Sequence, residues 1–217
     1  MIAGRSTSSR LIGGFGLYAA IAAYMIFSLF PIFWTLKISV TPERLLYSEG
    51  ITFWPSRTTL QNFVTVLEAT DFPRYFLNSV IVSVSTAALV TVIATLAGYA
   101  MSRFTFRGKA ALALMLLLTQ TFPLVMVIPP IYRVMGQIGL INSLTGLIII
   151  YTAFNTAFAT FLMQSFFDGI PKDLEEAAMI DGCTRAQAMR KVIVPLTLPG
   201  MGATLGFVFT AAWSELL

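Results

Sequence analysis

Long apolar stretches alternate with shorter polar segments along this chain of 217 residues. The first stretch, residues 11–36, has no charged residue, and Lys37 follows directly after it. An α-helix rises about 1.5 Å per residue, so about 20 apolar residues are enough to cross the hydrocarbon core of a membrane. The pattern predicts spanning helices over residues 11–36, 77–101, 110–130, 143–167 and 200–217.

Composition supports the same fold class. Hydrophobic residues make up 57% of the chain and charged residues only 11%, and the mean hydropathy is +0.80. Soluble domains carry about 25% charged residues. We therefore expect an all-α, polytopic transmembrane helical bundle that forms a single domain over residues 1–217. Pro129 and Pro130 are expected to end the third span, and the apolar stripe from Ile131 to Ile138 predicts a short helix lying in the membrane interface.

Basic residues are distributed unevenly between the two sides of these spans. Residues 1–14, 102–109 and 166–198 contain nine Lys and Arg residues, whereas residues 37–78 and 131–142 contain five. The more basic side of a membrane protein faces the cytoplasm. We therefore expect the N-terminus and the segment 166–198 to be cytoplasmic.

The charged and reactive residues exclude several kinds of site. The net charge of +4 comes from basic residues at the ends of apolar stretches, which favours membrane orientation over nucleic-acid binding. On this interpretation Arg103, Arg107 and Lys109 only orient the protein. With no histidine and a single cysteine, the chain cannot form an internal disulfide, a Cys/His metal site or a Ser-His triad. We expect no catalytic and no metal-ligating residue.

The longest polar segment of the C-terminal half, residues 168–198, predicts two short helices joined by a glycine elbow. Pro171 suits the first position of a helix, where its missing N–H is not needed. Gly182 suits the left-handed conformation that ends a helix. Thr184 and Gln187 have the spacing of a capping box at the start of a second helix.

The residues Glu176-Ala177-Ala178, followed by Asp181-Gly182 and then by Pro195 and Pro199, resemble the EAA loop of permease subunits of bacterial type I ABC importers. An ordinary amphipathic cytoplasmic loop is the alternative. The resemblance implies that the first short helix is a coupling helix, which docks in a groove of a cytoplasmic ATPase. The residues expected to couple the chain to the ATPase are Leu174, Glu175, Glu176, Ala177, Ala178, Asp181 and Gly182.

Shorter motifs are similar to the maltose-type subgroup of this family, which imports carbohydrates. They are Leu60–Phe63, Asn78-Ser79, Gly98–Ala100 with Arg103 and Gly108, Pro129 with Gly139-Leu140 and Asn142, and Trp213–Glu215. The subgroup normally has six spans, so we expect a chain truncated after about five. A permease for a non-sugar solute, or a non-functional truncated fragment, stays open as an alternative.

The resemblance also implies the partners of the chain. They are a second permease subunit, an ABC ATPase dimer that binds ATP and Mg²⁺, an extracytoplasmic solute-binding protein and a carbohydrate substrate. The chain itself would carry no cofactor, bind no nucleic acid and lie in the bacterial cytoplasmic membrane. Secondary transporters need a coupling-ion site, yet no acidic residue lies inside the first four predicted spans. A membrane scaffold and a membrane enzyme are the other rival classes; the lack of histidine and of clustered intramembrane carboxylates disfavours the enzyme.

Two polar residues lie in the middle of predicted spans. Gln120 lies in the third span and Asn155 in the fourth. Polar side chains within a membrane face the bundle interior or a wet path. They could line a route for a hydroxyl-rich solute, or they could hydrogen-bond neighbouring helices. The sequence favours neither of these two roles.

The expected orientation has a direct test. In a Cys183→Ser background, a cysteine placed at Ser48 should react with an impermeant thiol reagent added to intact cells, because residues 37–78 are expected to lie outside. Labelling that requires permeabilised cells would reverse the orientation.

Overall fold

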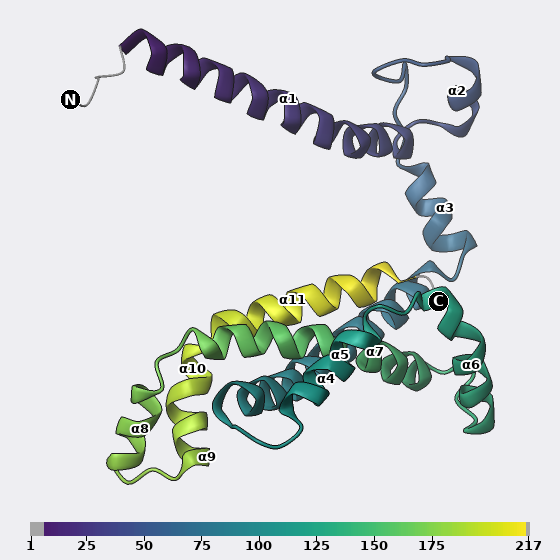
Figure 1. The fold of residues 1–217 in the computed structure, drawn as a ribbon. Coiled ribbons are helices and arrows are strands. Elements are labelled where there is room, and N and C mark those ends of the chain that lie inside the picture. Colours follow the sequence, from purple (N-terminus) through teal and green to yellow (C-terminus); the bar gives the residue numbers. More distant parts are fainter. Residues whose placement is uncertain (1–6, 216–217) are drawn as a thin grey trace. The chain divides into compact units, whose positions relative to one another are not determined.

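The computed structural model describes residues 7–215, with side chains from Gly16 onward except at Leu124. Its described part contains helices and no strand (Figure 1). The helices are α1 (Thr7–Ser39), α2 (Glu43–Ser48), α3 (Gln61–Ala69), α4 (Phe72–Arg103), α5 (Lys109–Thr119), α6 (Leu124–Gln137), α7 (Leu144–Asp168), α8 (Asp173–Ile180), α9 (Arg185–Ala188), the π-helix η1 (Met189–Ile193), α10 (Val194–Leu196) and α11 (Leu198–Ser214).

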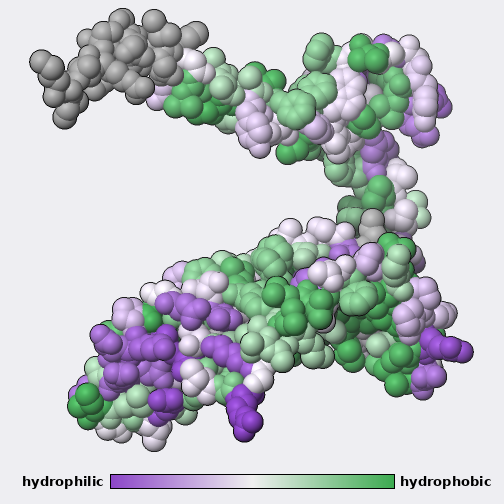
Figure 2. Space-filling model, viewed as in Figure 1, coloured by the Kyte–Doolittle hydropathy of each residue, from purple (hydrophilic) through white to green (hydrophobic). Residues whose placement is uncertain are grey.

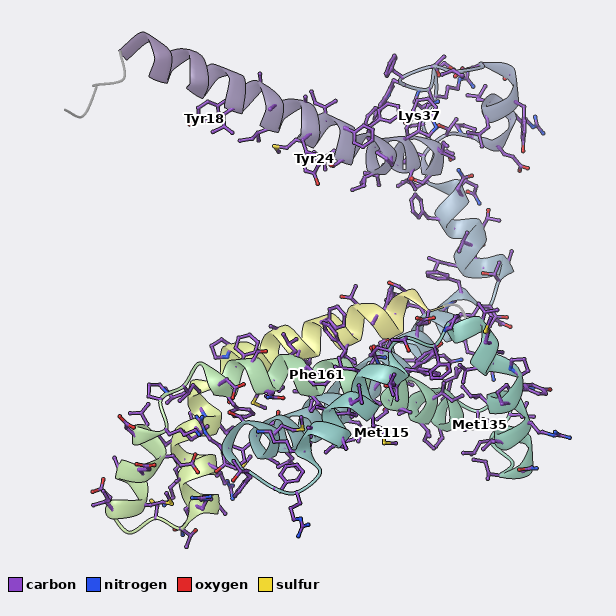
Figure 3. The ribbon with its side chains drawn as sticks, in the orientation of Figure 1. Tyr18, Tyr24, Lys37, Met115, Met135 and Phe161 are labelled. Carbon is purple, nitrogen blue, oxygen red and sulfur yellow. The ribbon has the colours of Figure 1, made fainter. Side chains whose placement is uncertain are left out.

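The chain divides into two compact units, residues 1–73 and 74–217, each of which is described by itself. In the first unit, the side chains of α1 are exposed from Gly16 through Phe33. Figure 3 marks Tyr18 and Tyr24, each 73% exposed, along this helix. A helix that is apolar on every side is typical of a membrane span, in which lipid covers the side chains.

The first unit is closed by contacts at the end of α1. Asn62 of α3 donates hydrogen bonds from Nδ2 to the carbonyls of Ser39 and Thr41, at 3.0 and 2.9 Å. Lys37, marked in Figure 3, is buried, and its Nζ lies 4.8 Å from the centroid of the Trp34 ring. The face of the Trp34 ring attracts the ammonium group of Lys37. Lys37 lies at the end of the apolar stretch, as the sequence predicted.

The core of the second unit lies where α4, α7 and α11 meet. It includes Ala87, Val90, Ala94, Tyr99, Ala159, Met163, Phe167, Ile193 and Val208. Small residues let these helices approach closely, as is typical of helix packing in membranes. The buried hydroxyls of Thr95, Thr160 and Thr204 each donate to the carbonyl four residues earlier in their own helix. These three hydroxyls are thereby satisfied without water, whereas the buried hydroxyls of Ser83, Thr86 and Thr91 in α4 have no hydrogen-bond partner among the described residues.

Within the described residues, three helices are long and apolar enough to cross a membrane, namely residues 16–39 of α1, α4 and α7, and the bent pair Arg185–Leu196 and Leu198–Ser214 would be a fourth if it is one span. The predicted third span over 110–130 is instead two helices, α5 and α6, separated at residues 120–123. Pro123 explains the break, because a proline disfavours helical geometry in the residue before it. Pro129 and Pro130 lie inside α6, so the expectation that they end a span was wrong.

The C-terminal helices form a bent pair. Helix α11 follows the helical segment Arg185–Leu196 after a bend of 70°. It begins at Leu198, two residues before the predicted start, with Pro199 at its second position. That position tolerates a proline because its N–H has no partner within the helix. Residues 216 and 217 of the predicted fifth span lie outside the described residues.

The contact between α4 and α7 can be tested at Gly98. A Cβ added to Gly98 would lie 2.8 Å from the backbone nitrogen of Gln164 and 2.9 Å from Cβ of Met163. We expect Gly98→Ala to destabilise the protein by about 1–3 kcal/mol, as overpacking does. The matched control is Gly202→Ala in α11, where a Cβ would meet nothing within 4 Å. Thermal unfolding in detergent should show a loss for the first variant only, since alanine is the better helix former.

Candidate functional site

The polar loop between α7 and α11 carries the residues that the sequence marked for coupling. Figure 2 shows hydrophilic side chains gathered over the end of the molecule that Figure 1 labels α8 and α9. The loop follows the C-terminal end of α7, whereas the connection from α6 enters α7 at its N-terminal end. The loop therefore leaves the opposite end of α7 from the α6 connection.

Backbone hydrogen bonds define both short helices of the loop. Helix α8 ends in a Schellman motif, in which the N–H of Cys183 donates to the carbonyl of Ala178 and the N–H of Gly182 donates to that of Met179. Gly182 has φ +89°, the left-handed conformation predicted for it. The predicted capping box of Thr184 and Gln187 is confirmed. Pro171 was expected to begin the first helix, but α8 begins at Asp173 with Lys172 as its N-cap.

The seven residues expected to couple to an ATPase divide between two faces of the loop. Glu175 and Ala178, three positions apart, are buried. The others are exposed: Leu174, Glu176, Ala177, Asp181 and Gly182. Residues three or four apart lie on the same side of a helix. One face of α8 therefore packs on the protein, and the opposite face is open.

The buried carboxylate of Glu175 is the centre of a polar network. Tyr99 donates its hydroxyl to Oε1 of Glu175 at 2.5 Å. Nε of Arg103 lies 3.3 Å from Oε2, and Nε of Arg185 lies 3.8 Å from Oε1. The side chains of Arg103 and Glu175 are only 4% and 5% exposed. A buried charge requires such partners, because water no longer solvates it.

Further contacts hold the same groups in place. Arg103 donates from Nη2 to the carbonyl of Ile170, at 2.9 Å, just before α8. The guanidinium of Arg185 lies 5.2 Å from the centroid of the Phe104 ring. The ring of Tyr99 meets Phe104 edge-on, with centroids 5.9 Å apart. The end of α4 is thus joined to both short helices of the loop.

Sequence reasoning missed the role of Tyr99 and Arg103. Arg103 was expected only to orient the protein, and Tyr99 appeared only within a family motif. The available signal was their spacing: residues four apart lie on one face, here at the end of an apolar helix. Their partner Glu175 lies far along the chain, and only the folded structure shows the pairing.

The two residues predicted for a solute path make different contacts. Gln120 is exposed and donates from Nε2 to the carbonyl of Phe154 in α7, at 3.2 Å. Asn155 is half-buried and donates from Nδ2 to the carbonyl of Tyr151 in its own helix, at 2.9 Å. Gln120 therefore makes the interhelical hydrogen bond that was the alternative role. A role for either residue in a solute path stays a prediction.

Comparison with known proteins places the chain in a family. Residues 91–217 match the model of the family described as binding-protein-dependent transport system inner membrane component. The chain belongs to this family. It is 36% identical to the sulfoquinovosyl glycerol transport system permease protein of Agrobacterium fabrum, over 92% of this chain and 70% of that protein. It is 34% identical to the trehalose transport system permease protein of Mycobacterium tuberculosis, over 88% and 69%.

A solved structure supports the fold of this permease. A chain from a bacterial ABC transporter involved in the import of the acidic polysaccharide alginate matches with a TM-score of 0.82. The match covers 98% of the permease and 74% of that chain, at 23% sequence identity. The expected all-α fold of an ABC importer permease is confirmed.

The elbow at Gly182 has a direct test. A side chain in the left-handed conformation costs about 1–2 kcal/mol. Space is not the limit, because a Cβ at Gly182 would meet nothing within 4 Å. Gly182→Val should therefore speed hydrogen exchange in residues 173–193 of the purified permease. Gly182→Asn, which tolerates this conformation better, should change exchange less; equal effects of both variants would contradict the conformational explanation.

Proposed function

We propose that this permease is the transmembrane subunit of a carbohydrate ABC importer and that α8 docks on a cytoplasmic ATPase. The observation that carries the proposal is the open face of α8, held on a loop whose other face is buried. ATP and Mg²⁺ would be bound and used by the ATPase, and the permease would carry no cofactor. Closure of the ATPase pair would move α8, and the spanning helices would rearrange around the solute.

The open face of α8 has the chemistry of a protein-binding surface. Leu174 is 43% exposed and Ile180 is 86% exposed, with exposed Ala177 between them. Exposed apolar side chains within a polar segment favour a protein partner. Glu176 lies beside them and supplies a charge for a basic residue of the ATPase. The small side chain of Ala177 leaves room for close approach of that partner.

The relatives support a carbohydrate as the substrate. Their names specify sulfoquinovosyl glycerol, trehalose and diacetylchitobiose transport. Sugars need hydrogen-bond donors and acceptors along their route, and Gln120 and Asn155 are our proposed contributors. A non-sugar solute is the alternative, which uptake assays with labelled sugars would separate.

The remaining parts of the importer follow from the family. A second permease subunit would complete the path, and an extracytoplasmic solute-binding protein would deliver the sugar. We place the N-terminus and the α8 loop in the cytoplasm, on the basic side of the membrane. In this orientation α8 faces the compartment that holds the ATPase.

Docking is tested by co-purification of the cognate ATPase with the permease. Glu176→Lys should weaken retention of the ATPase by about 2–5 kcal/mol, because it places a like charge against the partner of Glu176. The matched control is Glu68→Lys in α3, which is also an exposed glutamate and lies on the side predicted to be outside. We expect this variant to retain the ATPase. Full retention and normal sugar uptake with Glu176→Lys would overturn the docking assignment.

A further inference from the structure

Two adjacent glutamates of α8 lie in opposite environments. Glu176 is exposed, whereas Glu175 is 4% exposed and contacts α4 through Tyr99 and Arg103. The two carboxylates therefore cannot have the same role. If Glu176 belongs to a docking surface, Glu175 belongs to the attachment of that surface to the spanning helices.

The end of α4 is tied to the chain on both sides of the α7–α8 connection. Ser102 donates its hydroxyl to Oδ1 of Asp168, the last residue of α7, at 2.5 Å. Arg103 reaches the carbonyl of Ile170 and the carboxylate of Glu175. These contacts join α4 to the end of α7, to the connection and to α8.

The pairing of Glu175 with Arg103 resists separation. Separating two buried charges leaves each one without its partner in a poorly solvated site, which is strongly unfavourable. The hydroxyl of Tyr99 adds a short hydrogen bond to the charged carboxylate, and such bonds are stronger than neutral ones. A displacement of α8 would therefore carry the end of α4 with it.

Helix α4 can pass such a displacement along the bundle. It is 32 residues long and contains no internal break. At Gly98, α4 packs closely against α7. Near the other end of α4, Phe76 packs edge-on against Trp213 of α11, with ring centroids 5.6 Å apart. Motion entering at Arg103 thus reaches the packed helices of the second unit.

We propose that Glu175, Arg103 and Tyr99 form a joint that makes α4 move together with α8. Glu175 and Arg103 are positioning residues in this joint, and they need not touch the ATPase. The inference rests on the proposed coupling role of α8. It adds the route by which movement of α8 enters the spanning helices.

The experiment measures a distance between α8 and α4 in two states of the assembled importer. Spin labels are attached to cysteines at Lys172, the exposed N-cap of α8, and at Leu96, which is 58% exposed on α4, in a Cys183→Ser background. The distance distribution is recorded without nucleotide and after the cognate ATPase is trapped with ATP, Mg²⁺ and vanadate. Neither measurement requires the solute. With the joint intact, the distance should be the same in both states.

Variants that cut the joint should make this distance depend on nucleotide. In Glu175→Gln and Arg103→Gln, trapping should shift the distance by about 1–5 Å, the size of element shifts in such transitions. Tyr99→Phe removes only the hydroxyl and keeps the ring that packs on Phe104 and Phe167, so it preserves the fold if the charge variants do not. It should give a smaller shift in the same direction. Combining Tyr99→Phe with Glu175→Gln should add nothing, because both changes break one network.

The matched control is Asp173→Asn, which neutralises an exposed carboxylate of the same helix and should leave the distance fixed. The inference alone would be overturned if the label-to-label distance changed with nucleotide in the unsubstituted permease. It would also be overturned if that distance stayed unchanged in all joint variants that retain the ATPase. If Glu175→Gln releases the ATPase to the same extent as Glu176→Lys, then Glu175 is a docking residue. That result would also overturn the inference. If the unsubstituted permease does not retain the ATPase, the proposed function falls, and this inference falls with it.

Discussion

A carboxylate removed from water must be paired within the protein, and the burial of Glu175 is the constraint on which the loop depends. Its partners Tyr99 and Arg103 lie on α4, so α8 can satisfy this group only by turning one side toward that helix. Successive residues of an α-helix are about 100° apart, since 3.6 residues make one turn. Fixing Glu175 inward therefore also decides that Leu174 and Ala177 face outward.

The same constraint requires the end of α4 to lie close to α7. The absence of a side chain at Gly98 permits this approach, because any Cβ there would overlap the backbone near Met163. Tyr99, the next residue, then packs edge-on against Phe167 at the end of α7, with ring centroids 5.7 Å apart. Small-residue packing in the bundle and ion pairing in the loop thus support one another.

In the part of the chain that the structure describes, helices α1, α5 and α6 are not positioned by a buried ion pair of this kind. The described side chains of α1 are apolar and exposed over most of its length, and the helix belongs to a separate compact unit. Helices α5 and α6 are separated at residues 120–123 within a stretch, residues 110–130, that contains no charged residue. Hydrophobicity alone favours membrane insertion of these segments, but it does not determine where a helix is interrupted or what it packs against.

The sequence by itself determined the helical class, the approximate positions of α1, α4, α7 and α11, and the local structure of the loop. These features depend on interactions between near neighbours: the capping box of Thr184 and Gln187, the left-handed Gly182 and the long uncharged stretches. The resemblance of the EAA segment also indicated the family that the comparisons then showed.

Only the tertiary structure decided which of two adjacent glutamates is buried and that Arg103 has a partner beyond the membrane interface. Glu175 and Glu176 are neighbouring acidic residues in the first turn of one short helix, and their local sequence does not show which of them is buried. The difference between them arises from α4, whose paired residues lie more than 70 positions away along the chain. Pairings of this kind depend on how helices pack in three dimensions, and local periodicity carries no information about them.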